Sequence, residues 1–318
     1  MSWSSILGQD EALRRLRTSF ARGRLAHAFA FVGPEGIGKR LFALELAKAF
    51  LCEASPAPLT ACERCAACSL VAAETHPDFH VARKPEEKSE LPVEAIRNVL
   101  QKLGLKPTRG HGSVVLVEDA DDFNEESANA FLKTLEEPPN GTEIMLLSTG
   151  IERLLPTIRS RVQVVPFRPL SSAVLDELLT QRGIDDAGRR KLLIETCSGS
   201  VGRATALDHP AVWAFREALI AQLRSRLPNP VQLARLWMDF AESAGKEVPA
   251  QRARAALGIP FVLNHLQGEL KRDVSAGGLL IERIQAHLEA CQQAQYYFDR
   301  RVQIVLVVEQ LADRLCAI

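Results

Sequence analysis

The chain has 318 residues, 47% hydrophobic and 25% charged, and this length favours two or three domains over a single core. Lys plus Arg and Asp plus Glu number 39 each, so no net charge draws the protein to DNA or acidic lipid, and any such contact must be local or supplied by partners. No apolar stretch is long enough to cross a bilayer and no leader follows Met1, which predicts a soluble, cytoplasmic protein.

A glycine-rich loop follows the first two predicted elements. Apolar residues at helical spacing predict a helix over 10–24 with its arginines on a solvated face, and the run 28–32 predicts a short strand. The strand leads directly into Gly33-Pro-Glu-Gly-Ile-Gly-Lys-Arg40, and a helix pattern follows over 41–50. This order is the context of a phosphate-binding loop, in which backbone N–H groups and the helix N-terminus face phosphate oxygens. The predicted nucleotide-binding residues of the loop are Gly33, Gly36, Gly38 and Lys39.

Arg40 departs from this pattern. It stands where the motif needs Ser or Thr to hold Mg²⁺, and a guanidinium cannot ligate a cation. Three interpretations stay open. ATP with Mg²⁺ binds without efficient hydrolysis, or the nucleotide is lost and the loop is kept as architecture, or another ligand supports hydrolysis.

Four of the seven cysteines lie within residues 52–68. Such clustering in a reducing compartment argues against disulfides, and two overlapping C-x-x-C steps with a further cysteine upstream suit tetrahedral ligation of Zn²⁺. Four sulfur ligands leave no open position, so the predicted zinc is structural, and His76 and His80 are alternative ligands that the set does not need. The predicted ligands are Cys52, Cys62, Cys65 and Cys68.

Polar residues follow two of the remaining predicted strands. The run 114–117 is wholly apolar, which is typical of a parallel strand buried on both faces, and it ends in Glu118 and Asp119. Open α/β sheets bind ligands at this edge, and Thr149, after the predicted strand 144–147, is expected there too. The other predicted elements of this part are a strand over 79–82, a helix over 93–103, a Gly-rich turn at 110–112 and a fifth strand over 162–167.

A helix is predicted after the acidic strand end. Asn124 or Ser127 can begin it, apolar residues recur at a spacing of three and four, and Pro138-Pro139 must end it. Beyond residue 168 the strand pattern stops. Short helices are predicted over 171–206, and an almost wholly helical region is predicted over 209–318. Its breaks are predicted at Pro228, at Pro230, over 245–249 and at Gly277-Gly278.

The aromatic residues of the helical region are compatible with a stacking surface, but a helix-bundle core explains them without any ligand. They are Trp213, Trp237, Tyr296, Tyr297 and Phe298.

These residues together resemble the AAA+ clamp-loader family of bacterial DNA polymerase III, and within it the delta-prime branch. The resemblance covers about residues 3–203. It rests on the four-cysteine insert and on Leu25-Ala-His-Ala28, Thr75-His-Pro-Asp78, Asn129-Ala-Phe-Leu-Lys-Thr-Leu-Glu-Glu-Pro-Pro139 and Arg159-Ser-Arg161. It implies an α/β fold followed by an all-α region. The implied domains are an AAA+ P-loop domain with a parallel five-stranded sheet over 1–167, its zinc-binding insert at 52–78, a small helical lid over 168–207 and a C-terminal helical collar over 208–318.

The family implies a function in replication. Its members form a five-subunit ring that loads a sliding clamp on primed DNA, with tau/gamma subunits as ATP-hydrolysing motors and delta as a further partner. Carried onto this sequence, the resemblance implies that Arg161 is an arginine finger acting in trans on the ATP of the adjacent motor, with Arg159 as a weaker candidate. An intramolecular ion pair of Arg161 is the structural alternative. No polymerase chemistry is expected from the chain itself.

The departures from the family pattern all fall on the chain's own hydrolytic elements. The acidic pair is Glu118 then Asp119 where a motor has Asp then Glu, and Gly202 stands where an arginine is expected, with Arg203 following it. Val162 replaces the cysteine that ends the Ser-Arg-Cys pattern. Three hypotheses follow. The first is a clamp-loader subunit with little ATPase activity of its own, its rival is an active AAA+ ATPase of tau/gamma type or a helicase loader, and the third is a P-loop nucleotide kinase with a zinc-bearing lid.

Overall fold

The computed structural model describes residues 3–85, 87–88, 90–109, 112–225, 227–276 and 281–317. The predicted turn at Gly110 and His111 and the predicted break at Gly277-Gly278 lie outside these residues. By packing, the chain forms two compact units, residues 1–179 with 199–202 and residues 180–198 with 203–318. The division into domains at 167/168 and 207/208 stays a prediction.

The first unit is an α/β sandwich, and every strand of the chain predicted from sequence is present in it. The strands are β1 (Ala28–Val32), β2 (Phe79–Ala82), β3 (Ser113–Val117), β4 (Thr142–Ser148) and β5 (Gln163–Pro166). The helices that accompany them are α1 (Asp10–Ala21), α2 (Lys39–Leu51), α3 (Ala66–Ala72), α4 (Val93–Leu103), α5 (Glu125–Glu136), α6 (Pro156–Arg159) and most of α7 (Ser172–Gln181), with short 3-10 turns at Trp3–Ser5 and Ala120–Asp122.

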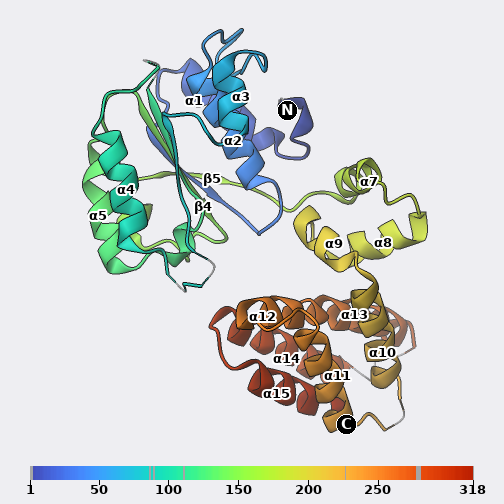
Figure 1. Ribbon diagram of the computed structural model, residues 1–318. Helices are drawn as coiled ribbons and strands as arrows, with labels where there is room; N and C mark the ends of the chain where they lie inside the picture. Colours follow the sequence, from blue (N-terminus) through green and yellow to red (C-terminus); the bar gives the residue numbers. More distant parts are fainter. Residues whose placement is uncertain are drawn as a thin grey trace. The chain divides into compact units, whose positions relative to one another are not determined.

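All strand pairs of the sheet are parallel, and the order is β2-β3-β4-β1-β5. Helices α1, α2 and α3 lie on one face of the sheet, and α4 and α5 lie on the other (Figure 1). Because β1 and β4 are neighbours in the interior of the sheet, the loops that follow them open at the same edge. The predicted parallel five-stranded sheet is therefore confirmed.

Side chains that alternate along the strands build two separate cores. Phe29 and Phe31 of β1 point into the α1–α2 side, where they pack with Phe42, while Ala28 and Ala30 face the α4–α5 side. All five residues of β3 are buried, as expected for a strand covered on both faces. The large aromatic residues thus concentrate on the face that carries the glycine loop and the cysteine insert.

Helix α5 begins and ends where its sequence requires. Asn124 is the N-cap, and its side chain accepts a hydrogen bond from the N–H of Ser127, whose hydroxyl oxygen accepts one from the N–H of Asn124. The helix ends at Glu136, before the two prolines. Of the two predicted starting residues, Asn124 is the cap and Ser127 completes a capping box.

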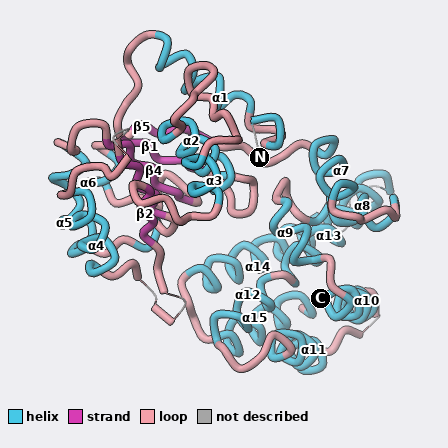
Figure 2. Tube along the Cα trace, turned by 45° about the horizontal axis from the view of Figure 1, so that its top comes forward, coloured by secondary structure: helices cyan, strands magenta, loops and turns pink. Residues whose placement is uncertain are grey.

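The second unit is wholly helical over its described residues (Figure 2). Trp237 is its buried centre, with Phe215 edge-on at 5.6 Å between ring centroids and Nε1 donating to the carbonyl of Ala255 at 2.9 Å. Phe298 is also buried and Trp213 and Tyr297 are half-buried, whereas Tyr296 is exposed, so the predicted aromatic core holds for these residues except Tyr296. The helices are α8 (Ala187–Thr196), α9 (Val201–Leu207), α10 (Pro210–Leu223), α11 (Pro230–Glu242), α12 (Val248–Ala256), α13 (Gly258–Ala276), α14 (Ile281–Asp299) and α15 (Ile304–Cys316).

Among the described residues, no helix combines the length and the apolar character needed to cross a membrane.

One half-buried carboxylate of the first unit has a buried oxygen atom without compensation. Glu143 lies on β4, and in the described part of the chain its Oε2 atom has no hydrogen-bond partner. Burial raises the pKa of Glu143 to about 7. The folded protein therefore holds the proton of this carboxyl at pH values at which the unfolded chain releases it.

This proton sets the direction of a pH effect on stability. Since the pKa of Glu143 in the folded protein lies above its value in the unfolded chain, the free energy of unfolding falls as the pH rises from the unfolded pKa towards 7. Above that pH it levels off. We expect Glu143→Gln to stabilise the protein more at pH 8 than at pH 5, by roughly 1–2 kcal/mol. Urea unfolding at both pH values measures the difference. An equal effect at both pH values would show that Glu143 is ionised throughout.

Candidate nucleotide and metal sites

The glycine loop between β1 and α2 has the backbone of a phosphate-binding loop. Gly36 and Gly38 have φ angles of 72° and 97°, in the left-handed region that favours glycine, and Gly38 is the N-cap of α2. Lys39 is folded back over the loop, and its ammonium group donates to the carbonyl oxygens of Gly33 at 2.5 Å and Pro34 at 2.6 Å. Burial lowers the pKa of Lys39, against the opposing charges of Asp121 and Glu35. The ammonium group with which a nucleotide phosphate would have to interact is therefore hydrogen-bonded to carbonyl oxygens of the loop.

Arg40 forms a closed ion network with residues of three other segments. Its Nε donates to Oε1 of Glu118 at 2.7 Å, and its Nη2 contacts Glu74. Arg83 joins the same two carboxylates, with its Nε 2.9 Å from Oε2 of Glu118. Two guanidinium groups and two carboxylates thus neutralise each other at the carboxyl end of β3, where a magnesium ion would lie in a nucleotide site of this type.

The network keeps its charges because each member is paired. Burial acts to lower the pKa of Arg40, but the hydrogen bonds that Arg40 donates to Glu74 and Glu118 outweigh it and the pKa rises. For Glu74, burial acts to raise the pKa, and the hydrogen bonds from Arg40 and Arg83 reverse it. Glu118 is therefore held by two guanidinium groups in the place of a metal ion.

Thr149 and Asp119, the other predicted nucleotide residues, are also held by their own chain. Thr149 donates both its N–H and its hydroxyl to Oδ2 of Asp121, at 2.8 and 2.5 Å, and Ser148 donates to Oδ1 at 2.6 Å. Asp119 accepts a hydrogen bond from the N–H of Lys84 at 2.8 Å. The predicted residues lie at one edge of the sheet. There Thr149 is hydrogen-bonded to the segment that follows β3, and Asp119 is hydrogen-bonded to the segment that follows β2.

Gly202, in the short segment 199–202 that belongs to the first unit, packs against the glycine loop. Its N–H donates to the carbonyl of Gly36 at 3.0 Å, and a Cβ atom built on Gly202 would lie 2.9 Å from the Cα of Gly36. A Cβ on Gly36 would lie 2.4 Å from Oγ of Ser200. Because such distances are too short for real Cβ atoms, the arginine expected at position 202 cannot be accommodated unless the backbone moves.

Arg161 lies at the other end of the sheet from the glycine loop. It precedes β5, whereas the loop follows β1, and the two strands are parallel neighbours with Phe29 opposite Gln163. Its Nε donates to Oε1 of Glu136 at 2.7 Å, and its Nη1 donates to the carbonyl of Thr157 at 3.0 Å. The Arg161 side chain is 31% exposed and the Glu136 side chain is 51% exposed, so solvent reaches the ion pair. Arg159, at the end of α6, is exposed as well.

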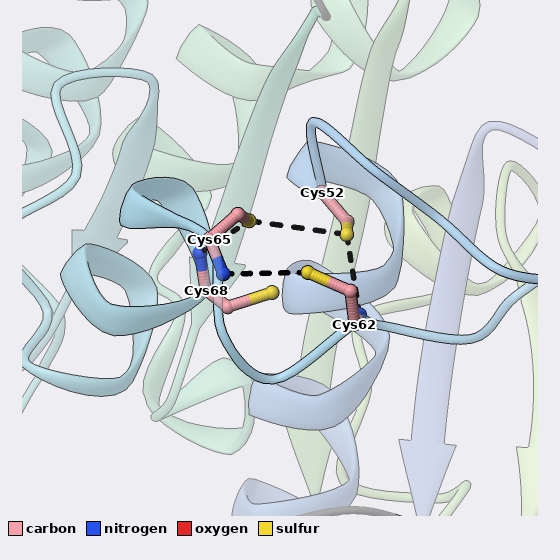
Figure 3. Close-up of side chains that lie close together, drawn as sticks. All are labelled: Cys52, Cys62, Cys65 and Cys68. Carbon is pink, nitrogen blue, oxygen red and sulfur yellow. Dashed lines mark hydrogen bonds between the residues drawn. The ribbon is translucent and has the colours of Figure 1, made fainter.

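Four cysteines converge between α2 and α3 (Figure 3). Cys52 caps α2, Cys65 caps α3, Cys68 lies in the first turn of α3, and Cys62 comes from the loop between them. Their sulfur atoms all lie within 4.8 Å of one another, with 4.0 Å between those of Cys52 and Cys65. Tetrahedral zinc with bonds of about 2.3 Å needs sulfurs about 3.8 Å apart, so the cluster fits this ion after a small contraction.

Backbone N–H groups donate hydrogen bonds to two of these sulfurs, which favours the thiolate form that binds a cation. The N–H groups of Cys62 and Cys65 donate to the sulfurs of Cys52 and Cys62, both at 3.3 Å. A backbone hydrogen bond from Arg64 lowers the pKa of Cys62 to about 6, whereas burial raises the pKa of Cys68. The four cysteines are therefore a cluster consistent with structural zinc, and His76 and His80 are not part of it.

Several proteins are similar to this chain. The family model "DNA polymerase III, delta subunit" matches residues 8–171. The delta-prime subunit of Pseudomonas aeruginosa is 36% identical over 220 residues, covering 68% of this chain and 67% of that protein. The delta-prime subunit of Escherichia coli is 32% identical over 229 residues, covering 72% and 68%. The tau subunit of Escherichia coli is 30% identical over 216 residues, covering 66% of this chain and 33% of that protein.

Among solved structures, the chain is similar to a DNA polymerase III gamma subunit-related protein of Thermotoga maritima. The identity is 20%, the TM-score is 0.45, and the match covers 94% of this chain and 97% of that one. The sheet order and the lysine-bearing glycine loop define an AAA+-like P-loop protein with a four-cysteine insert and a helical region. The family model matches about half of the chain, and the alignments span about two thirds of the delta-prime relatives. The chain belongs to the delta-prime subunit family of the DNA polymerase III clamp loader.

Sequence reasoning missed the partners that fill the nucleotide site. Arg83 follows β2 directly and Glu118 follows β3 directly, and these strands are adjacent, so their meeting was open to prediction from strand order. Glu74 gave no such signal, because it lies beyond α3 with a φ of 57°. Asp121 stands in a run of acidic residues in which nothing distinguishes it.

The cysteine cluster makes a prediction for the purified chain. We expect one zinc ion per chain, and Cys65→Ser should release it, because the variant removes one of the four thiolate ligands while serine can still cap α3. The sheet should persist, since the insert lies outside it. Metal analysis by atomic emission and circular dichroism measure the two outcomes. Cys291→Ser, a buried cysteine of the second unit, is the control that should keep its zinc.

Proposed function

We propose that this chain acts in the cytoplasm as a delta-prime-type subunit of a clamp-loader ring with tau/gamma and delta subunits. In this role it helps to load the sliding clamp on primed DNA. It completes the ATP site of the adjacent motor with Arg161 and hydrolyses little or no ATP itself. The similarity to tau and gamma subunits, at 30% and 32% identity, supports a place beside them.

The observation that carries low hydrolysis is the ion network around Arg40. An incoming magnesium nucleotide needs Glu118 and the ammonium group of Lys39, but two arginines hold the first and loop carbonyls hold the second. To bind, the nucleotide must break these contacts and leave Arg40 beside its own metal ion. Coulomb repulsion between the guanidinium and Mg²⁺ opposes this step. Of the three interpretations of the loop, this favours loss of the nucleotide with the loop kept as architecture.

The position of Arg161 supports action on a neighbouring subunit. The residue lies at the opposite end of the sheet from its own glycine loop, so it cannot reach a nucleotide there. Its ion pair with Glu136 is solvent-exposed, and such pairs contribute only about 0–1 kcal/mol. A triphosphate with higher charge density can displace Glu136 at little cost. A guanidinium in that position stabilises the charge that develops on the transferred phosphoryl group.

The rival function is an active AAA+ ATPase of tau/gamma type. It requires magnesium beside Glu118 and an arginine near the phosphates from the segment after Gly199. Arg40 fills the first place, and the contact between Gly202 and Gly36 leaves no room for the second. The same contacts argue against the nucleotide kinase.

We expect Arg161→Ala to reduce the DNA-stimulated ATP turnover of the reconstituted ring, by about tenfold or more at the adjacent motor site. The variant should fold and keep its zinc, because it removes only an exposed ion pair and two exposed hydrogen bonds within its own segment. Steady-state phosphate release from rings built with either form measures the effect. Arg159→Ala is the matched control, and it should leave turnover near the level of the unaltered chain.

Two outcomes would contradict this assignment. Full turnover with Arg161→Ala would remove Arg161 from the role, and a loss seen only with Arg159→Ala would transfer the role to that residue. The chain alone should show no ATPase activity above background. A rate equal to that of a motor subunit would favour the rival function.

A further inference from the structure

Helix α3 connects the cysteine cluster to the ion network. It has seven residues, its N-cap is Cys65 and its first turn contains Cys68. At its other end Glu74 has a left-handed φ of 57°, and its N–H donates to the carbonyl of Val71 at 3.0 Å. An isolated helix of this length is unstable in water, so its position depends on what holds its ends and its buried side.

The insert is fastened to α2 by a buried lysine. Lys48 of α2 is only 2% exposed, and its ammonium group contacts Glu63, in the loop between Cys62 and Cys65, at 2.8 and 2.9 Å. It also pairs with Glu45 at 2.5 Å. Burial acts to lower the pKa of Lys48, but its two carboxylate partners raise it, so the charge is kept. The insert loop is therefore bound to the same helix whose first turn contains Arg40.

The far end of the insert reaches the pocket. Glu74 contacts Arg40 and Arg83, which both also contact Glu118. Helix α2 thus has Arg40 near its beginning and Cys52 as its C-cap, and α3 returns the chain from the cysteines to Arg40. The two helices and the cluster form a closed path that begins and ends at Arg40.

We propose that the cysteine cluster, when it holds zinc, fixes the position of α3. Glu74, which follows α3, then keeps the guanidinium of Arg40 in contact with Glu118. Glu74 is a positioning residue of the degenerate nucleotide site, and the cysteine insert holds Glu74 in place through α3. This role does not depend on Arg161 or on the assembly of a ring. It assigns to the insert a contact with the pocket of its own domain.

The coupling must act in both directions. If the bound metal favours the contact between Glu74 and Arg40, then the contact favours the bound metal by the same factor. Loss of the contact should therefore weaken zinc binding, although neither residue touches the cluster. We expect the weaker binding to show as faster release of zinc. A purely local metal site predicts no such effect.

The test measures zinc release from the purified full-length chain to a chromogenic chelator. We expect Glu74→Gln to speed release about fivefold to tenfold. Arg40→Ser should speed release by less, because Arg83 still pairs with Glu74. The double variant should release zinc no faster than Glu74→Gln alone, since Glu74→Gln already breaks the contact that Arg40→Ser removes. Arg97→Ser is the matched control, because it removes a surface arginine that pairs with Glu126 far from the insert in sequence.

Release at the unaltered rate in both Glu74→Gln and Arg40→Ser would overturn the proposal. Equal acceleration in Arg97→Ser would also overturn it, because the effect would then be general destabilisation. Thermal unfolding of each variant in the zinc-loaded form separates local loosening from loss of the whole fold. Additive effects in the double variant would show two independent contacts in place of one path.

Discussion

The pairing of Arg40 with Glu118 joins the first turn of α2 to the carboxyl end of β3, and the rest of the loop end of the sheet is arranged around it. A guanidinium carries one positive charge where a magnesium nucleotide site carries two, and it cannot exchange ligands as a metal ion does. Arg83 and Glu74 complete the charge balance, so the four side chains satisfy one another without any bound molecule. In the P-loop of this delta-prime family member, the lysine likewise bonds to the carbonyl oxygens of its own loop.

Other parts of the first unit agree with this closed state. Asp121 binds the end of β4 through Ser148 and Thr149, and the backbone of Gly202 packs on Gly36. Each of these contacts lies beside the glycine loop or at the same edge of the sheet. Arg161, by contrast, pairs with the exposed carboxylate of Glu136 and donates to Thr157 and Ser160 of its own segment, and its side chain stays 31% exposed. The chain thus combines an inward-facing site filled by its own groups with an arginine accessible from outside.

The sheet was predictable because its physical signals are local. The apolar runs at β1, β3 and β4 have the pattern of buried parallel strands, and Asn124 with Pro138 delimits α5. The cysteine cluster was predictable for the same reason, since spacing alone brings its sulfurs together. The partners of Arg40 and Arg161 were not, because they depend on which loops meet at a sheet edge and on rotamers of long side chains. No local pattern encodes the contact of Glu74 or of Glu136.

The contact between Gly202 and Gly36 limits how this sequence can change. Replacing Arg40 alone by serine would leave Arg83 on Glu118, and placing an arginine at position 202 alone would force two backbones apart. Each single step towards hydrolysis therefore meets an obstacle that only the other steps remove. The glycine pair thus couples position 202 to the glycine loop, because a side chain added at either position displaces the backbone of the other.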